Sequence, residues 1–388
     1  MTIEEVDRVL FVGAGTMGSA NSLVAAVRGY EVVLHDAREE TLDLVPARHD
    51  EIGAYLIERG YCREDDLVAA RGRVRLAPDL ADAVERVDLI SESVFEDLGL
   101  KRDLHRRLDE SAPVDAVLTT NTSALLVSEI EDVVDRGERF AALHSHLGAL
   151  LFDIVGGPRT SPATVDLLRR YVLSLGGTPL VLRKEHPGYV FNAMNGAVLA
   201  MALRLVIEGR ASRPAVDRAW MADRGAPMGP FGMMDLFGLD LVLDAWRRPF
   251  EDEAREALRP AVMALLSEQV DRGRLGLKAG GGFYDYPDPA YQEAAFLTAE
   301  GPSSDVADAL RSALVTSAVA LAAADVATPD DIDLAWTAAT GLGQGPFGVI
   351  DEMGHDAVLA TIAELIDAGL MPPGTLDATE AWFGRTER

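Results

Sequence analysis

The sequence predicts a doubly wound α/β sheet followed by an all-α domain that is present in two tandem copies. Three observations predict this class: a glycine-rich turn directly after a short apolar run, further apolar runs that end in polar residues, and two matching helical segments in the second half. We expect a nucleotide-binding domain over residues 1–186, a helical domain over residues 187–290 and its second copy over residues 300–388.

The first apolar, β-branched run is typical of a buried parallel strand, and a GxGxxG turn follows it. In such a turn the first glycine permits the sharp bend, the second lets a pyrophosphate approach the backbone, and the third lets helix and strand pack closely. The Ala- and Val-rich stretch that follows suits a helix whose N-terminus faces the anion. The residues expected to hold the dinucleotide pyrophosphate are Gly13, Gly15, Thr16, Met17 and Gly18.

A second strand-like run ends in Asp36, at the separation from the glycines that is typical of a dinucleotide site. Its carboxylate can accept hydrogen bonds from a ribose diol and would repel a 2′-phosphate, which favours NAD over NADP. Two alternatives stay open. Asp36 is also a plausible N-cap for a helix that follows it, and Arg38 stands where an arginine can bind a 2′-phosphate.

Two further strands are expected over residues 87–94 and 116–123, after a segment at residues 40–83 that has a helical pattern throughout. Ligands of open α/β sheets bind at the carboxyl ends of the strands, so polar side chains there are expected where cofactor and substrate meet. These side chains are Glu92, Glu96, Asn121 and Ser123. Another apolar run ends at His144.

The composition excludes several classes of function. With 63 acidic and 36 basic residues the formal net charge is -27, which repels phosphate backbones, so we expect no nucleic-acid partner. The single Cys62 excludes an internal disulfide and, without a neighbouring Cys or His in the sequence, predicts no metal site. No apolar run approaches the length of a membrane span, and the N-terminus lacks a basic, apolar leader. We therefore expect a cytoplasmic protein without membrane contact.

The second half contains an internal match. Residues 217–235 and 333–351 both carry Gly-Pro-Phe-Gly as a turn between helical stretches. Two copies indicate a duplication and not a solenoid. Residues 286–304, which are rich in Pro, Asp and Ser, are expected to link the copies.

A series of motifs, in order along nearly the whole chain, resembles the L-3-hydroxyacyl-CoA dehydrogenase family. The motifs are VGAGTMG (12–18), ESVFEDLGLKRDL (92–104), TNTSAL (120–125), RFAALH (139–144), PGYVFN (187–192), APMGPFGMMDLFGLD (226–240) and GLKAGGGFYDY (276–286). The resemblance implies a Rossmann-type NAD-binding domain, a helical domain, and NAD-dependent oxidation of a 3-hydroxyacyl substrate by hydride transfer.

The resemblance also implies roles for individual residues. His144 matches the family's catalytic histidine, Ser123 and Asn192 match its substrate ligands, and Glu96 and Lys101 match positions beside the nicotinamide. The chemistry agrees with this assignment. Hydride leaves a carbinol carbon readily only as the hydroxyl proton is removed, and a neutral imidazole is the natural base near pH 7.

The sequence departs from the family after the histidine. The family has an aromatic pair, Asn-Pro and a spacer before its dyad glutamate, whereas this chain has a shorter segment, lacks Asn-Pro and places Asp153 at the position of the glutamate. Because Asp is one methylene shorter than Glu, the loop must shift if the dyad forms. His146 is an alternative base if that loop is re-registered.

Three functions stay open at this point. The first is oxidation of a 3-hydroxyacyl thioester carried by coenzyme A or an acyl carrier protein. The second is oxidation of a free hydroxy acid, as in relatives that act on gulonate or carnitine. The third is NAD binding without catalysis. The tandem copy is expected to supply within one chain the surface through which single-copy relatives pair, which gives a monomer, although a homodimer stays open.

Overall fold

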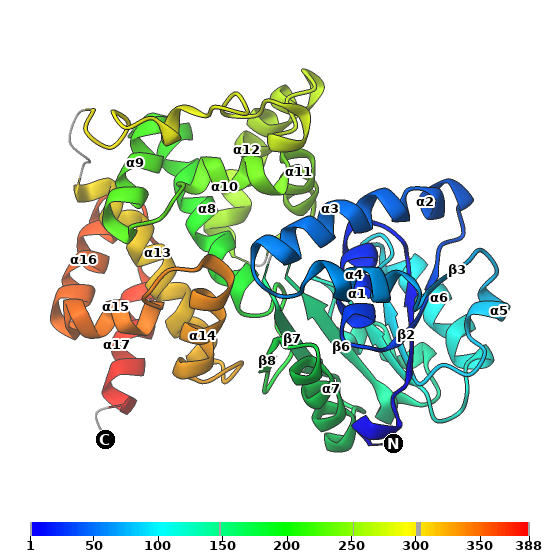
Figure 1. Ribbon diagram of the computed structural model, residues 1–388. Helices are drawn as coiled ribbons and strands as arrows, with labels where there is room; N and C mark the ends of the chain where they lie inside the picture. Colours follow the sequence, from blue (N-terminus) through cyan, green and yellow to red (C-terminus); the bar gives the residue numbers. More distant parts are fainter. Residues whose placement is uncertain (1, 147–148, 251, 300–303, 387–388) are drawn as a thin grey trace. The chain divides into compact units, whose positions relative to one another are not determined.

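The computed structural model describes residues 2–146, 149–250, 252–299 and 304–386. The chain divides into two compact units, one made of residues 1–190 with 325–331 and the other of residues 191–324 with 332–388. Figure 1 shows the elements of both units, and each unit is described here by itself.

In the described part of the first unit, eight strands form one sheet in the order β3-β2-β1-β4-β5-β6-β7-β8. All neighbouring strands are parallel except β6 and β7, which are antiparallel. The carboxyl ends of β1, β2, β4, β5 and β6 therefore share one edge of the sheet. The strands are β1 (Arg8–Val12), β2 (Glu31–His35), β3 (Val74–Ala77), β4 (Leu89–Glu92), β5 (Val117–Thr120), β6 (Phe140–Ser145), β7 (Leu151–Gly156) and β8 (Thr178–Val181).

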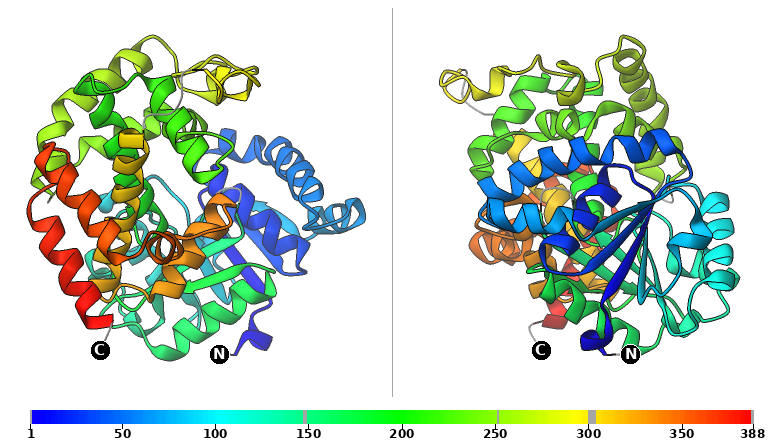
Figure 2. Two further views of the ribbon diagram at one scale, coloured as in Figure 1. Left: turned by 90° about the vertical axis from the view of Figure 1, so that its left-hand side faces the viewer. Right: turned by 45° about the vertical axis from the view of Figure 1, so that its right-hand side comes forward.

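Helices cover both faces of this sheet. One core contains residues of α1, α3, α4 and α7 together with the strands, and α6 lies on the opposite face (Figure 2). Strands that are buried on both faces explain why most of them read as continuous apolar runs. The helices of this unit are α1 (Thr16–Val27), α2 (Glu39–Asp43), α3 (Val45–Glu58), α4 (Glu64–Arg71), α5 (Leu80–Ala83), α6 (Leu98–Ser111) and α7 (Pro162–Ser174), with short 3-10 turns at Ile3–Glu5, Val127–Glu129, Glu131–Val133 and Gly137–Arg139.

The expectation of an uninterrupted helical pattern over residues 40–83 is wrong, because β3 lies inside that segment. β3 pairs in parallel with β2 and forms the edge of the sheet. Two of its four side chains, Arg75 and Leu76, are exposed, so no apolar run marks the strand in the sequence. Main-chain pairing with β2 stabilises this short edge strand, and side-chain burial contributes little.

The helices that follow residue 190 form the second unit. Capping residues set their limits locally: the Ser212 hydroxyl accepts a hydrogen bond from the Ala215 N–H at the start of α9, and Gly225 ends that helix with a φ of 64°. The helices are α8 (Phe191–Ile207), α9 (Arg213–Arg224), α10 (Pro230–Phe237), α11 (Leu239–Arg247), α12 (Glu253–Asp271), α13 (Ser304–Ala323), α14 (Pro329–Thr340), α15 (Pro346–Met353), α16 (His355–Asp367) and α17 (Gly374–Thr386), with 3-10 turns at Leu277–Ala279 and Ala290–Gln292.

The expectation that no apolar run reaches the length of a membrane span needs correction at α13. By length and composition this helix is able to cross a bilayer, and more than half of the relevant window is buried in the second unit. It contacts α8, α9, α15, α16 and α17 (Figures 1 and 2). A helix that is apolar nearly all round is typical of the centre of a helical domain, and α13 has that place. Asp305, Asp308 and Arg311 interrupt its first turns, which hides the apolar character in the sequence.

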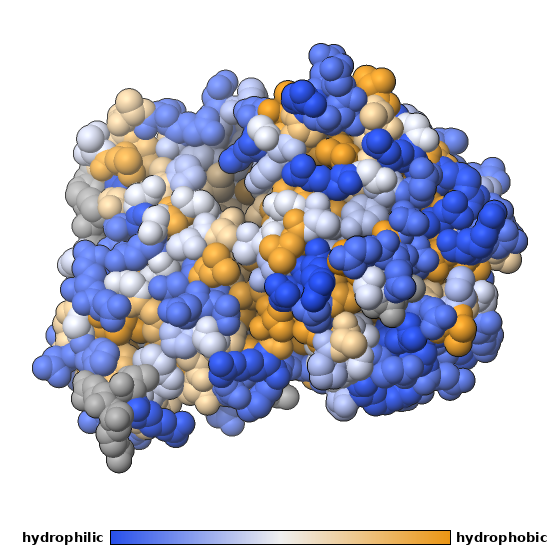
Figure 3. Space-filling model, turned by 60° about the horizontal axis from the view of Figure 1, so that its bottom comes forward, coloured by the Kyte–Doolittle hydropathy of each residue, from blue (hydrophilic) through white to orange (hydrophobic). Residues whose placement is uncertain are grey.

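Part of the expected linker at residues 286–304 is packed and not extended. Tyr291 and Phe296 are buried, and the Arg218 side chain of α9 donates a hydrogen bond to the Phe296 carbonyl oxygen. Residues 300–303 of this segment lie outside the described residues. On the face of the molecule in Figure 3, hydrophilic residues cover most of the surface, with smaller apolar patches between them.

Candidate active site

The turn between β1 and α1 has the geometry of a dinucleotide cradle. Gly13 has a φ of 101°, and a Cβ added there would lie 2.7 Å from the Ser93 carbonyl oxygen; at Gly18 it would lie 1.7 Å from the Gly13 carbonyl oxygen. At Gly15 an added Cβ would meet nothing within 4 Å. Tight packing at the first and third glycines, with open space at the second beside the start of α1, fits the approach of a pyrophosphate. Thr16 and Met17 form the first turn of α1 at the same place.

Asp36 follows the last residue of β2, as expected for the acidic residue of a dinucleotide site. One carboxylate oxygen accepts a hydrogen bond from the Ala14 N–H and the other from the Arg38 N–H, both at 3.0 Å. Asp36 does not cap α2, which begins at Glu39 with Arg38 at the N-cap position. The Arg38 guanidinium lies 3.8 Å from the Asp36 carboxylate and its side chain is 61% exposed. The carboxylate is therefore fixed against the glycine turn, where a ribose diol fits.

His144 and Asp153 form the contact that the sequence predicts. They are directly opposite each other in the antiparallel pair β6–β7, and His144 Nδ1 lies 2.8 Å from Asp153 Oδ2. Side chains opposite each other in such a pair project from the same face at short range. Both are buried, with 7% of His144 and none of Asp153 exposed. The strand register compensates for the shorter aspartate side chain.

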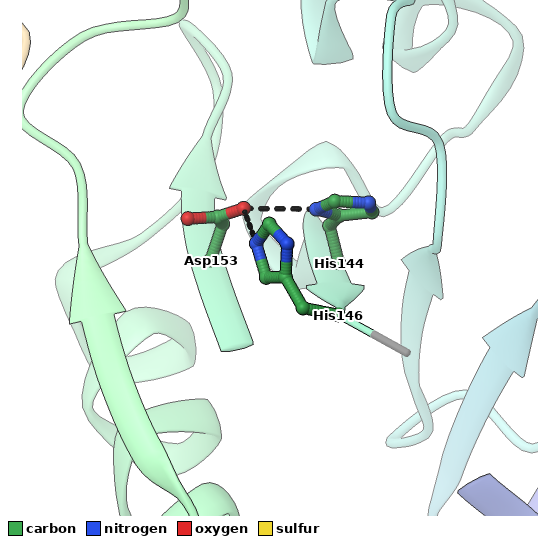
Figure 4. Close-up of side chains that lie close together, drawn as sticks. All are labelled: His144, His146 and Asp153. Atoms are coloured by element: carbon green, nitrogen blue, oxygen red, sulfur yellow. Dashed lines mark hydrogen bonds and ion pairs between the residues drawn. The ribbon is translucent and has the colours of Figure 1, made fainter. Parts of the chain in front are cut away.

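His146 binds the same carboxylate oxygen. Its Nε2 also lies 2.8 Å from Asp153 Oδ2, and Figure 4 shows the two imidazole rings turned toward that atom. The sequence reasoning treated His146 as a rival base and missed this second contact. The spacing of two residues along a strand was the available signal, because residues i and i+2 share a face.

The electrostatics of this group follow from burial and hydrogen bonding. Burial by itself raises the pKa of the Asp153 carboxyl, but the hydrogen bonds from His144 and His146 outweigh it and lower that pKa to about 2. Burial lowers the pKa of His144, the charge of His146 lowers it further, and Asp153 opposes both. At neutral pH an ionised Asp153 therefore faces a neutral His144 that donates from Nδ1, which leaves the lone pair on Nε2.

The nitrogen and oxygen atoms of this triad also lie within 4.8 Å of one another, a spacing that a metal ion is able to bridge. Hydrogen bonds to Asp153 already account for both ring nitrogens that would be the ligands.

Asn121 connects the ends of β5 and β6. Its side-chain oxygen accepts a hydrogen bond of 2.8 Å from the Ser145 N–H, and the Asn21 amide of α1 donates to the Ser145 hydroxyl, also at 2.8 Å. The residue between the two histidines is thus held from both sides. This network fixes the segment that carries His144 and His146.

Glu92, Glu96 and Lys101 form a buried network below the strand ends. The Lys101 ammonium lies 2.6 Å from one Glu92 oxygen and 3.4 Å from Glu96, and only 1% of Lys101 is exposed. Burial raises the pKa of Glu92, but Lys101 and then His105 lower it to about 2. The Glu96 carboxylate accepts a hydrogen bond from the Ser123 N–H. Lys101 therefore supports Glu96, which holds the loop of Ser123; the sequence reasoning did not identify His105.

Two more residues of the predicted site lie near the boundary of the units. Tyr189 belongs to the first unit, is 1% exposed, has a φ of 52°, and places its ring centroid 5.4 Å from that of His144. Its hydroxyl has no hydrogen-bond partner among the described residues. Asn192 belongs to α8 of the second unit and is half-buried there. Its predicted contact with substrate remains a prediction.

Comparison with known proteins identifies the family. The model described as the 3-hydroxyacyl-CoA dehydrogenase NAD binding domain matches residues 8–186. The model of the C-terminal domain of the same family matches residues 188–286 and 306–376.

Individual relatives agree with this result. The human protein named hydroxyacyl-coenzyme A dehydrogenase, mitochondrial, is 30% identical over 292 residues, which are 72% of this chain and 91% of the human one. A solved diketoreductase structure is 31% identical with a TM-score of 0.66, covering 72% of this chain and 99% of its own. The structure of 3-hydroxybutyryl-CoA dehydrogenase from Escherichia coli has a TM-score of 0.80 at 21% identity and covers 98% of this chain and 99% of its own, so it shares the fold of the whole chain.

Proposed function

The chain belongs to the 3-hydroxyacyl-CoA dehydrogenase family, and from this premise we propose that it oxidises the 3-hydroxyl group of an acyl-CoA to the 3-oxo form with NAD, or catalyses the reverse reaction. The observation that carries the proposal is the hydrogen-bonded pair His144–Asp153 at the end of β6. Since β1 and β6 end at the same edge of the sheet, this pair lies on the side of the sheet where the glycine turn would hold the cofactor.

The residues of the glycine turn and Asp36 would hold NAD, whose nicotinamide accepts a hydride from the substrate when bound. His144 acts as the general base. As the carbinol C–H bond breaks, the hydroxyl proton moves to His144 Nε2 and the C–O bond becomes a carbonyl. Asp153 keeps the Nδ1–H of His144 in place and stabilises the imidazolium that forms. In the reverse direction the imidazolium returns the proton.

His144 is a better candidate for this base than His146. It lies within β6, its ring orientation is fixed by the strand register and by Asp153, and burial keeps it neutral near pH 7. Ser123, held by Glu96 through its backbone N–H, is proposed to bind the substrate oxygen. Asn192 is proposed as its second ligand.

The experiment is a set of NADH-absorbance assays with 3-hydroxyacyl-CoAs, the same acids on an acyl carrier protein, and free 3-hydroxy acids. Turnover of the CoA thioesters is the expected result. A marked preference for carrier-protein thioesters would change the proposed carrier, and turnover of free acids alone would replace the substrate class. Tight NAD binding without turnover of any of them would contradict the proposal.

We also propose that the helical domain is duplicated. The Asp217 carboxylate accepts hydrogen bonds from the N–H groups of Phe231 and Gly232 at the start of α10. In the second segment Asp333 accepts from Phe347 and Gly348 at the start of α15 in the same way. Equal spacing, equal helix lengths and the same N-terminal carboxylate support a copy of one module. In this proposal the second copy is architectural and the chain is a monomer with one active site.

A further inference from the structure

The first unit contains an apolar cavity that the proposed chemistry does not use. It has a volume of about 280 Å³ and lies between α1, α3 and the connection from β6 to β7. Met17 and Ala20 line it from α1, Ile52 and Tyr55 from α3, and Phe152 from β7. Its size is almost twice that of the ~150 Å³ engineered cavity that binds benzene.

This cavity reaches the catalytic pair through a single side chain. His146 is part of its wall, and the same imidazole donates to Asp153 Oδ2, the atom that also accepts from His144. The ring centroids of the two histidines are 4.6 Å apart. A group held in the cavity therefore lies beside the reacting centre, on the His146 side.

The chemistry of the wall selects an uncharged, apolar occupant. Most of its surface is hydrocarbon or aromatic, and none of its described lining residues is a lysine or an arginine. Its ionisable carboxylate, Glu51, is exposed and would repel an anion. The Asn21 amide is already engaged with the Ser145 hydroxyl. The phosphates of coenzyme A would find no cationic partner here, whereas a hydrocarbon chain would lose water-exposed surface.

We propose that this cavity binds the hydrocarbon end of the acyl chain, so that the protein prefers 3-hydroxyacyl thioesters of medium chain length over the four-carbon substrate. The proposal rests on the proposed function, because it assigns a substrate class to the same active site. The short connection between β6 and β7 brings Leu150 and Phe152 to the cavity wall, and Ala20 leaves the space open on the opposite side.

The expected effect follows from the burial of methylene groups. Each methylene that enters an apolar cavity raises kcat/KM by up to roughly fourfold. We expect the ratio of kcat/KM for 3-hydroxyoctanoyl-CoA to that for 3-hydroxybutyryl-CoA to be at least about 20 in the wild-type protein. The ratio is the useful quantity because general losses of activity cancel in it.

The test compares this ratio in three variants. Ala20→Leu fills the cavity and should lower the ratio toward one. Ala54→Leu adds the same side chain at an exposed position of α3 that does not line the cavity, and should keep the wild-type ratio. Tyr55→Ala enlarges the cavity and should shift the preference toward still longer chains, which gives a second result if Ala20→Leu does not fold.

A wild-type ratio near one would overturn the proposal, as would an Ala20→Leu ratio equal to that of Ala54→Leu. Either result would leave the proposed function intact, because the four-carbon thioester would still be oxidised. Failure of the wild-type protein to oxidise any thioester would instead refute the proposed function and this proposal with it.

Discussion

Substitution of His146 tests how one carboxylate serves two histidines. His146→Phe introduces the aromatic type that the family has after its catalytic histidine, and it removes one of two 2.8 Å hydrogen bonds to Asp153 Oδ2. Hydrogen bonds to charged groups contribute about 1.5–3 kcal/mol. If all of that free energy positions Asp153 for the transition state, kcat/KM falls by about 10- to 150-fold, which is an upper bound.

The same substitution should move the pH profile. The charge of His146 lowers the pKa of His144, after burial, while Asp153 and Glu96 raise it. Removing His146 therefore raises the pKa of His144, so the neutral base is lost at a higher pH as the solution is acidified. The acid limb of kcat/KM for the oxidation should shift to higher pH.

The assay is kcat/KM for NADH formation as a function of pH in the wild-type protein, His146→Phe and His146→Gln. The amide of glutamine keeps a donor for Asp153 without a titratable charge, so His146→Gln should recover much of the rate but keep the shifted limb. Wild-type rate and an unshifted limb in His146→Phe would refute the reasoning. A loss larger than that of His144→Gln would mean that His146 is the base.

The remaining predictions concern the other side chains of the account. Asp153→Asn should reduce kcat by about 10²–10⁴, because an amide cannot accept from both histidines and no longer stabilises the imidazolium, and unaltered steady-state rates would be inconsistent with the dyad. NAD should have a higher kcat/KM than NADP, and Asp36→Ala should narrow the difference; equal values in the wild-type protein would defeat the claim. EDTA treatment should leave turnover unchanged, since hydrogen bonds already satisfy the triad, and a metal-restorable loss would overturn that view. Truncation after Ser304 should expose an apolar face and give aggregates or dimers by light scattering, whereas Asp308→Ala should keep wild-type kinetics; a soluble, active, monomeric truncation would contradict the architectural role of the second copy.

The active-site pair was largely predictable from the sequence, because a strand register is set by alternation and by short connections. His144 and Asp153 each stand in an apolar run, and the two runs are joined by a short segment, which favours an antiparallel pair. The second contact of Asp153, to His146, was harder to predict. It depends on the side-chain directions at the end of β6, which the sequence pattern does not specify.

Other features depend on tertiary context that local sequence does not encode. β3 has exposed side chains and exists because its backbone pairs with β2. The buried contact between Lys101 and Glu92 joins a helix and a strand that are close only after the sheet has formed. The glycine turn, by contrast, is specified by steric limits within a few residues, which is why its place and shape follow directly from the sequence.

The central claim is that His144 is the general base of an NAD-dependent 3-hydroxyacyl-CoA dehydrogenase. The most direct measurement compares NADH formation from a 3-hydroxyacyl-CoA by the wild-type protein and His144→Gln, together with the NAD dissociation constant of each. The account predicts a loss of about 10²–10⁴ in kcat with NAD binding nearly unchanged. Wild-type turnover by His144→Gln, at unchanged NAD affinity, would contradict it.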